Sequence, residues 1–544
     1  MSLSIHPDSR SQVEAYDALP YQGRPCPESH PSRLSVVAKL AGLPIPDIGR
    51  CRILELACGD GNNLIAIADT LPEARCVGID LSPRHIAMGQ AEVAALGLRN
   101  VDLRQGDLLQ MNPGDPALGE FDFILAHCLY SWVPRAVQDR IFALCRRHLA
   151  RHGVAFVSYN LLPGWRLVQV LRDFLSFHTR SASNPKDRLQ KALNGAALLP
   201  LLTDAGSGDM SRFISQFGRD FVDRLNRLGG WRDQAVLHDL IGDPCTPVYF
   251  STFVNQASRH GLRYLGDAEF HSGLPPSLTK EAAEQLLPQV ETALDLEQYV
   301  DFAHMRTFRQ SLLCHAEAPL RAEPRQSDLH GLYVVSGWRP ASPPDLNSAA
   351  PVEFVGESDA KLRTNHPLTK AAFCILSEQA PHALGFSDLC TQAWQRLGQS
   401  GDVPDDDLNI LGTYVLRAFL SENRLLRLYA QAPAFPIVPG PKPQARPFAR
   451  RQVARGDEIT NLFHDNIAVD ALGQKLLPLL DGTRDVDALV GALLPMAQSG
   501  ALDVQALDDR LNATAQAPAA LEQALREEVR AQLASLARHA VLID

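Results

Sequence analysis

Residues 53–63 read ILELACGDGNN, and the interpretation of the whole chain starts from this stretch. A short apolar run enters a glycine-containing turn, and apolar residues at helical spacing leave it from Leu64 onward. A strand–turn–helix unit of this kind brings a nucleotide-like ligand to the N-terminus of the helix. Gly59 and Gly61 permit positive φ and a close approach of the backbone. Alone, the turn fits a structural connection as well as a ligand site.

Apolar runs and helical patterns alternate around this turn, over residues 51–160. We expect five strands with three helices between them, the strands at 52–56, 75–79, 101–105, 121–126 and 154–158 and the helices at 63–70, 83–96 and 134–149. This alternation predicts an α/β fold, a Rossmann-like parallel sheet covered by helices on both faces. Ligands of such sheets bind beyond the carboxyl ends of the strands, so the strand-end residues are the candidates for a site.

Three acidic residues stand at strand ends or in the turns that follow them, namely Glu55, Asp80 and Asp107. Asp80 has the spacing from the glycine turn of a carboxylate that binds ribose hydroxyls. Its alternative role is to cap the next helix, although Ser82 already suits that position. Asp107 is placed to accept from an adenine amino group, or else is an ordinary turn aspartate. The third glycine of a dinucleotide fingerprint is replaced by Leu64, which disfavours a nicotinamide cofactor.

Aromatic and polar tracts follow the fourth and fifth strands. They read AHCLYSWVP at 126–134 and SYNLLPGW at 158–165. Both are expected at the same edge of the sheet as the glycine turn, where aromatic ring faces attract a sulfonium or an ammonium by about 0.5–2 kcal/mol each. The alternative is that these rings belong to the core. His127 is the titrating side chain nearest to a strand end, and it fits either a general base or a packed histidine.

The pattern Glu55-x-x-Cys58-Gly59-x-Gly61 resembles motif I of class I S-adenosylmethionine-dependent methyltransferases, with Asp80 and Asp107 in the ribose and adenine positions. The YSWV and SYNxxPGW tracts, with the segment from Tyr21 to His30-Pro31, resemble the methyltransferases that carry a methyltransferase regulatory domain. That group includes protein-lysine methyltransferases that act on outer-membrane proteins. The sequence departs from it at Ala57, where many relatives have glycine, and at Cys128-Leu129.

The resemblance implies S-adenosylmethionine as cofactor and an N-methylated protein lysine as product. The cofactor-binding residues implied are Tyr21, His30, Glu55, Ala57, Cys58, Gly59, Gly61, Asn62, Asn63, Asp80, Leu81, Asp107, Leu108 and His127. The residues implied at the methyl acceptor are His127, Tyr130, Trp132, Tyr159, Asn160 and Trp165. An apolar, aromatic surround would favour the neutral amine of a lysine. Two alternatives stay open, a small-molecule methyltransferase and a cofactor-binding regulator without turnover.

The chain divides into six expected parts. Residues 1–50 form an arm that either lies on the surface or folds over the active site, and residues 51–165 form the cofactor-binding core. Residues 166–245 are a helical insertion, a lid or dimer contact, and 246–330 complete the core with a terminal strand pair. A winged-helix-like domain at 352–432 and a small α-rich domain at 456–544 follow. Asp301, Arg306 and Arg309 are expected to be surface ion pairs without a chemical role.

Composition excludes several classes of function. The formal net charge of −10 argues against binding to nucleic acid or to an anionic membrane. The N-terminal residues lack the plan of a signal peptide, and no apolar run approaches the roughly 20 residues that cross a bilayer. The ten cysteines are scattered, without a C-x-x-C pair, which favours a reduced cytoplasmic protein without a zinc site. A homodimer and a protein or small-molecule acceptor are the expected partners, and membrane insertion is not expected.

Overall fold

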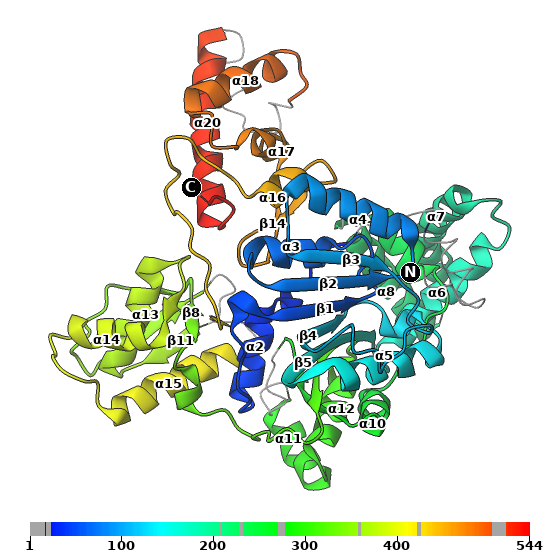
Figure 1. Ribbon diagram of the computed structural model, residues 1–544, viewed down its shortest axis with the longest axis horizontal. Coiled ribbons are helices and arrows are strands. Elements are labelled where there is room, and N and C mark those ends of the chain that lie inside the picture. The colour runs from blue at the N-terminus through cyan, green and yellow to red at the C-terminus, as the bar shows by residue number, and fades with distance from the viewer. Residues whose placement is uncertain are drawn as a thin grey trace. The chain divides into compact units, whose positions relative to one another are not determined.

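The computed structural model forms two compact units, and each is described by itself (Figure 1). The first consists of Met1–Arg24, Leu43–Ala68 and Pro72–Leu320, and the second of Pro25–Gly42, Asp69–Leu71 and Arg321–Asp544. The structure describes residues 17, 23–206, 208–227, 232–269, 278–356, 361–421, 426–502 and 518–543. None of the helices within these ranges is long and apolar enough to cross a membrane.

A seven-stranded sheet in the order β3-β2-β1-β4-β5-β7-β6 organises the first unit. Its strands are β1 (Arg52–Leu56), β2 (Arg75–Asp80), β3 (Val101–Gln105), β4 (Phe121–Ala126), β5 (Leu149–Asn160), β6 (Leu262–Asp267) and β7 (Phe308–His315). The pairs among β1 to β5 are parallel, while β7 runs antiparallel to both β5 and β6. The expected Rossmann-like fold is confirmed, and Figure 1 shows β3, β2, β1, β4 and β5 in this order.

Helices connect the first five strands as expected. They are α3 (Asn62–Thr70), α4 (Pro83–Leu96) and α5 (Arg135–His148). Local signals fix α4, because the Ser82 hydroxyl accepts from the His85 amide at the N-terminus and Gly97 ends the helix with a φ of 68°. Between the helices and the sheet, side chains such as Leu54, Ile124 and Phe156 are fully buried. The sheet is therefore a rigid platform for its strand-end residues.

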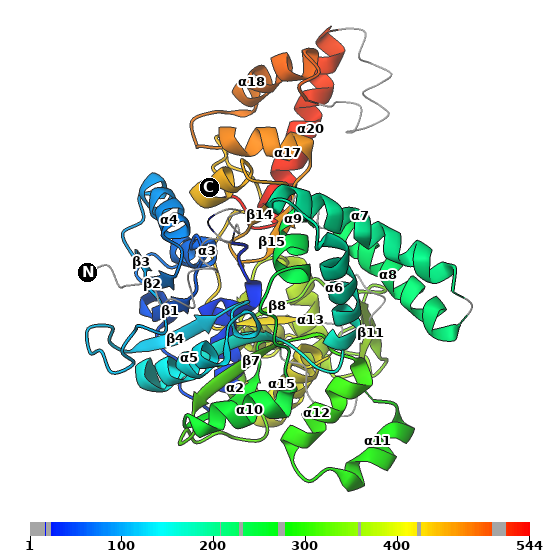
Figure 2. The same ribbon diagram turned by 90° about the vertical axis from the view of Figure 1, so that its right-hand side faces the viewer.

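A helical insertion separates β5 from the terminal strand pair. It contains α6 (Trp165–Thr179), α7 (Pro185–Asp204), α8 (Asp209–Arg227), α9 (Arg232–Gln234) and a π-helical turn, η6 (Ala235–Leu240). Figure 2 shows α7 and α8 side by side as a hairpin. Then α10 (Phe250–Arg259) leads into β6, and α11 (Lys280–Leu286) and α12 (Ala293–His304) precede β7. The sheet of the first unit is discontinuous in sequence, as the pattern predicted.

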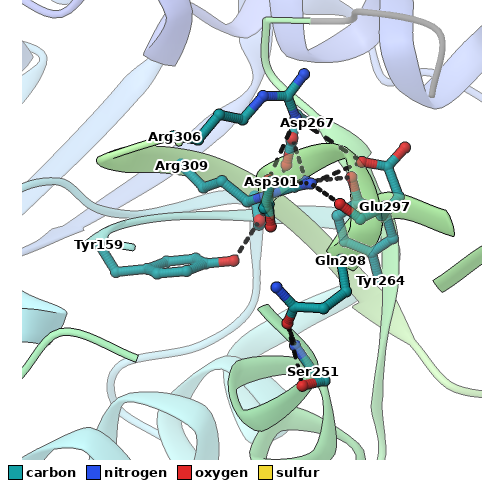
Figure 3. A network of polar contacts seen from close by, with 10 residues as sticks. Tyr159, Ser251, Tyr264, Asp267, Glu297, Gln298, Asp301, Arg306 and Arg309 are labelled. Carbon is teal, nitrogen blue, oxygen red and sulfur yellow. Dashed lines mark hydrogen bonds and ion pairs between the residues drawn. The ribbon is translucent and has the colours of Figure 1, made fainter. Parts of the chain in front are cut away.

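The expectation that Asp301 and Arg309 lie on the surface was wrong. Both are buried, with 0% and 3% of their surface exposed. In Figure 3 the Arg309 guanidinium lies among three carboxylates, and it bonds to Asp267 at 2.6 Å, to Glu297 at 2.7 Å and to Asp301 at 2.9 Å. These acids come from β6 and α12, so the network fastens α12 to the last two strands of the sheet. A buried arginine needs such partners.

The second unit combines small sheets with helices. Before the linker around 431–446 it contains η2 (Pro27–Ser29), α2 (Pro31–Leu40), η9 (Gln326–Leu329), β8 (Tyr333–Val335), β9 (Arg339–Pro340), β10 (Val352–Val355), β11 (Lys361–Thr364), α13 (Pro367–Gln379), β12 (Leu384–Gly385), α14 (Phe386–Arg396), α15 (Asp405–Phe419) and β13 (Arg427–Tyr429). Within the segment expected to be winged-helix-like, α13, β12, α14, α15 and β13 follow one another in this order. The strands β8 to β12 were not anticipated from the pattern.

The end of the second unit is mostly helical. It consists of α16 (Pro447–Gln452), β14 (Glu458–Thr460), β15 (Asn466–Ala468), α17 (Ala471–Leu476), η10 (Leu477–Leu479), α18 (Val486–Gln498) and α20 (Pro518–Arg538). One face of the last helix is buried, with Leu525, Val529 and Leu533 each no more than 2% exposed.

Candidate functional site

The turn between β1 and α3 takes a left-handed backbone at three positions. Ala57, Gly59 and Gly61 have φ values of 55°, 58° and 73°. At Gly61 a Cβ atom would lie 2.8 Å from a methyl carbon of Leu103, whereas at Gly59 it would meet no atom within 4 Å. Gly61 is therefore required by packing as well as by φ. Gly59 leaves open space beside the backbone, which suits the close approach of a ligand.

Asp80, at the end of β2, is tied to this turn. Its Oδ2 accepts from the Gly59 amide at 2.9 Å and its Oδ1 accepts from the Ser82 amide at 2.8 Å. Because the hydroxyl of Ser82 caps α4, Asp80 is not the helix cap. Asp107 follows β3, is 4% exposed, and accepts from the Leu109 amide at 2.9 Å. Both carboxylates lie at the carboxyl edge of the sheet, where the sequence placed them.

Glu55, the last polar residue of β1, carries an unsatisfied buried oxygen. Its Oε1 accepts from the Asn63 side-chain amide at 2.9 Å, while Oε2 has no hydrogen-bond partner within the described part of the chain. Burial raises the pKa of Glu55 to about 7, although Asn63 and the nearby His127 act in the opposite direction. A buried carboxylate oxygen without a donor is costly and calls for a ligand that supplies one.

The backbone at Gly23 crosses the glycine turn. The Gly23 amide donates to Oδ1 of Asp60 at 3.1 Å, and the side-chain amide of Asn62 donates to the Gly23 carbonyl at 3.0 Å. The end of the N-terminal arm is thus fastened over residues 60–62. Tyr21, two residues earlier, lies outside the described residues.

His30 belongs to the second unit and has structural contacts there. Its Nδ1 accepts from the Ser32 amide at 3.2 Å, which caps α2, and its Nε2 lies 3.3 Å from the Thr70 hydroxyl. Burial lowers the pKa of His30 to about 3, so the ring is neutral. These contacts account for His30 as a helix cap.

The two aromatic tracts split into core residues and residues beside the strand ends. Tyr130 and Tyr159 are 0% and 1% exposed and pack against Phe253 of α10, with ring centroids 5.3 and 4.1 Å away. Their hydroxyls bond to Gln256 at 2.5 Å and to Ser311 at 3.0 Å. This burial contradicts the expectation that Tyr130 and Tyr159 line the acceptor site. Both are core residues.

Trp132 and Trp165 pair across the two tracts. Their rings meet edge to face at 6.3 Å, and the Arg172 guanidinium lies 5.4 Å from the Trp132 ring. Trp132 is half-buried in the short helix η4 (Tyr130–Trp132), and Trp165 is 9% exposed at the start of α6. Asn160 ends β5 at 3% exposure, and its side chain donates to the Cys245 sulfur at 3.6 Å.

His127 lies beside Ser158 and near two carboxylates. Its Nδ1 lies 3.1 Å from the Ser158 hydroxyl, and its charge lowers the pKa of both Glu55 and Asp239, a carboxylate of η6. Asp239, Arg172 and Ser158 were missed in the sequence. Asp239 and Arg172 belong to the helical insertion, and no local pattern distinguishes them from solvent-exposed charges.

Three family models match the chain. They are described as a methyltransferase domain over residues 53–153, a predicted methyltransferase regulatory domain over 232–315, and a PKMT C-terminal winged helix domain over 441–541. An uncharacterised protein of Rickettsia prowazekii, RP028, is 31% identical over 251 residues, which cover 46% of this chain and 96% of that protein. A second one, RP789, is 29% identical over 530 residues, covering 96% and 91%.

A solved structure of PKMT2 from Rickettsia typhi superposes with a TM-score of 0.82 at 26% identity, covering 96% of this chain and all of that one. PKMT2 in complex with AdoHcy gives a TM-score of 0.80 at 27% identity. The chain belongs to the class I S-adenosylmethionine-dependent methyltransferases with a regulatory domain. Its cofactor is therefore S-adenosylmethionine, of which AdoHcy is the demethylated product.

The residues of this methyltransferase fit that cofactor. Glu55 Oε2, which has no partner among the described residues, and the open space at Gly59 lie at the end of β1 and in the turn before α3. Asp80 ends β2, and Asp107 follows β3. Among the implied cofactor residues, Cys58, Asn62, Asn63 and Leu108 are buried around the turn and strand ends, and Leu81 and Ala57 are half-buried. The winged helix model matches 441–541, later than the 352–432 segment where the sequence placed such a domain.

Proposed function

We propose that this methyltransferase N-methylates lysine side chains of a protein substrate. The observation that carries the proposal is the match to PKMT2 over the whole chain, since it includes the insertion, the regulatory region and the second unit as well as the cofactor core. PKMT denotes a protein-lysine methyltransferase. A shared cofactor core alone would leave the acceptor open, because that fold serves many acceptors.

Bound S-adenosylmethionine supplies a methyl group on a positively charged sulfur. We assign Asp80 to the ribose hydroxyls, Asp107 to the adenine amino group, and the buried Glu55 oxygen to the cofactor's ammonium group. The strand ends hold these groups in place, because Asp80 is fixed by two backbone amides and Glu55 by Asn63. Trp132, Asn160 and Trp165 then border the acceptor. Their partly apolar surround excludes water and favours a neutral amine.

The substrate class we propose is an outer-membrane or surface protein, methylated in the cytoplasm. Its support is the same resemblance, together with ten free cysteines, eight of them buried, which suit a reducing compartment. We also propose that two copies associate through the α7–α8 hairpin. This hairpin exposes the apolar side chains of Leu201, Leu202, Met210 and Phe213, with 67%, 52%, 71% and 50% of their surface accessible.

The test is transfer of labelled methyl groups. The protein is incubated with S-adenosylmethionine labelled in the methyl group and an outer-membrane protein fraction of a Gram-negative bacterium, and the label is located by mass spectrometry. Label on lysine Nζ is expected, and it should be lost when the fraction is first acetylated on its lysines. Label on a small molecule, or on acetylated and untreated fractions alike, would contradict a lysine acceptor. Cofactor binding without any transfer would indicate a regulator without turnover.

A further inference from the structure

Within the region that matches the regulatory domain, residues 232–315, the backbone at residues 246–248 hydrogen-bonds to both aromatic tracts, 126–134 and 158–165. The Thr246 amide donates to the Ser131 carbonyl at 2.7 Å, and the Val248 amide donates to the Asn160 carbonyl at 3.1 Å. Cys245, one residue earlier, meets the Asn160 side chain. The residues just before this segment, from η6 onward, therefore lie next to the side of the sheet where the acceptor is expected.

The π-helical turn η6 is fastened to the tryptophan pair through Arg172. The buried Arg172 guanidinium donates to the carbonyls of Asp239 and of Gly242, the second at 2.6 Å, while its face lies over the Trp132 ring. Single π-helical turns occur frequently at functional sites. Arg172 thus fixes the backbone of Asp239 close to Trp132.

The Asp239 carboxylate is half-buried and has no hydrogen bond or ion pair to any residue that the structure describes. Burial raises its pKa to about 6, against the lowering effects of Arg172 and His127. Other charged or titratable groups of the surrounding segments are Arg188, which donates to the Ile241 carbonyl, and Asp243, which is 78% exposed and pairs with Arg172 at 3.5 Å. The segment that carries Asp239 also contains Arg232, Asp233 and His238. Near pH 7 the Asp239 carboxylate is therefore ionised and lacks a donor, an arrangement that a cationic ligand would satisfy.

The alternative titrating group, His127, is already engaged through its ring nitrogen. The fully buried Ser158 hydroxyl accepts from the Cys128 amide at 2.7 Å and lies 3.1 Å from Nδ1 of His127. The other ring nitrogen of His127, Nε2, lies 3.4 Å from the Cys128 sulfur. Both ring nitrogens of His127 therefore have a neighbouring side chain, whereas the Asp239 carboxylate has no such partner among the described residues.

We propose that Asp239 binds the ammonium group of the acceptor lysine beside Trp132 and Trp165, and so selects cationic amines over neutral or anionic acceptors. The inference deepens the proposed function and rests on it. A carboxylate together with an aromatic face is a favourable environment for an ammonium. The bound ammonium must release its proton to water before the neutral amine can attack the methyl group. The ion pair therefore acts in the binding of the acceptor, and its loss should raise KM and change kcat much less.

The experiment compares Asp239→Asn, Asp239→Glu and a matched control, Asp243→Asn, which removes a 78% exposed carboxylate whose pair with Arg172, at 3.5 Å, is expected to contribute little. The probe is the same outer-membrane protein fraction, titrated by total lysine concentration. At pH 7.5 we expect the apparent KM to rise at least about 10-fold in Asp239→Asn, with kcat within about threefold of wild type. Asp239→Glu should retain most of the affinity, and Asp243→Asn should behave as wild type.

The pH dependence of KM distinguishes a binding role of Asp239 from a purely structural one. Protonation of Asp239 should raise the wild-type KM as pH falls below about 6, a rise that Asp239→Asn should lack. Calorimetry with AdoHcy establishes in each variant that the cofactor site is folded. If the protein labels lysine but Asp239→Asn and Asp243→Asn have equal KM values, the inference about Asp239 is overturned and the proposed function stands. A wild type that binds AdoHcy and labels no lysine overturns the proposed function, and the inference with it.

Discussion

Replacing Glu55 by glutamine should raise the stability of the ligand-free protein and weaken its binding of AdoHcy. The buried carboxyl has its pKa raised from 4.5 to about 7, so between these pH values the folded state holds a proton that the unfolded state has released. Stability of the wild type therefore falls as pH rises through this window, and above pH 7 the full cost of the buried charge is present. At 1.36 kcal/mol per pK unit the cost is about 0.8 kcal/mol at pH 5 and about 3 kcal/mol at pH 8.

Glutamine keeps the oxygen that accepts from Asn63 and removes the charge, but it buries an amide without an acceptor, at about 1 kcal/mol. The net expectation for Glu55→Gln is a gain of about 2 kcal/mol at pH 8 and almost none at pH 5. Scanning calorimetry of the ligand-free protein at the two pH values measures the difference. The matched control is Glu73→Gln, whose side chain is 66% exposed and which should change stability by less than about 0.5 kcal/mol.

Binding of AdoHcy supplies the second half of the test. If the free Glu55 oxygen accepts from the ligand's ammonium, losing that charge-assisted bond should weaken binding about 10- to 150-fold in isothermal calorimetry. A Glu55→Gln protein that is destabilised at pH 8, or equally affected at both pH values, would refute the burial argument. Unchanged AdoHcy affinity would show that this oxygen does not face the ligand.

Three further perturbations test separate parts of the structure. Ala57→Gly relieves a left-handed φ of 55° and should stabilise the protein by about 0.5–1 kcal/mol in thermal unfolding, whereas Ala68→Gly, inside α3, should cost at least about 1 kcal/mol. Arg309→Met leaves three carboxylates without their buried cation and should cost about 3–5 kcal/mol at neutral pH, less below pH 6, against a small effect of Arg306→Met. Phe213→Asp should shift a dimer to monomer in analytical ultracentrifugation without changing AdoHcy affinity; a monomeric wild type would contradict the proposed contact.

The parts of the fold that local patterns determine were predictable. The bounds of α4 matched because its start and end are set by adjacent residues, Ser82-Pro83 and Gly97. The start of β5 at Leu149 was missed, because Arg151, His152 and Gly153 interrupt the apolar pattern where the pairing with β4 is irregular in register. Strand-end acids were predictable for a similar reason, since the carboxyl ends of parallel strands meet at one edge whatever lies between them.

The acceptor side was less predictable, because distant segments decide it. Tyr130 and Trp132 stand two residues apart, yet Tyr130 is fully buried while Trp132 is half-buried. The ring that covers Tyr130 is Phe253, more than 100 residues later in α10. The burial of Arg309 likewise depends on acids from β6 and α12, and the place of Asp239 depends on Arg172. Periodicity and spacing carry no information about such pairings.

The antiparallel strand β7 has a consequence for biosynthesis. It pairs with β5 on one side and β6 on the other, but it begins about 150 residues after β5 ends. At a synthesis rate of roughly 5–20 residues per second, the β5 edge emerges about 7–30 s before its partner exists. During that interval an apolar strand presents unpaired amides and carbonyls to the cell, which is the condition for mispairing. Ribosome-associated chaperones should therefore be needed most between the emergence of residue 160 and that of residue 315.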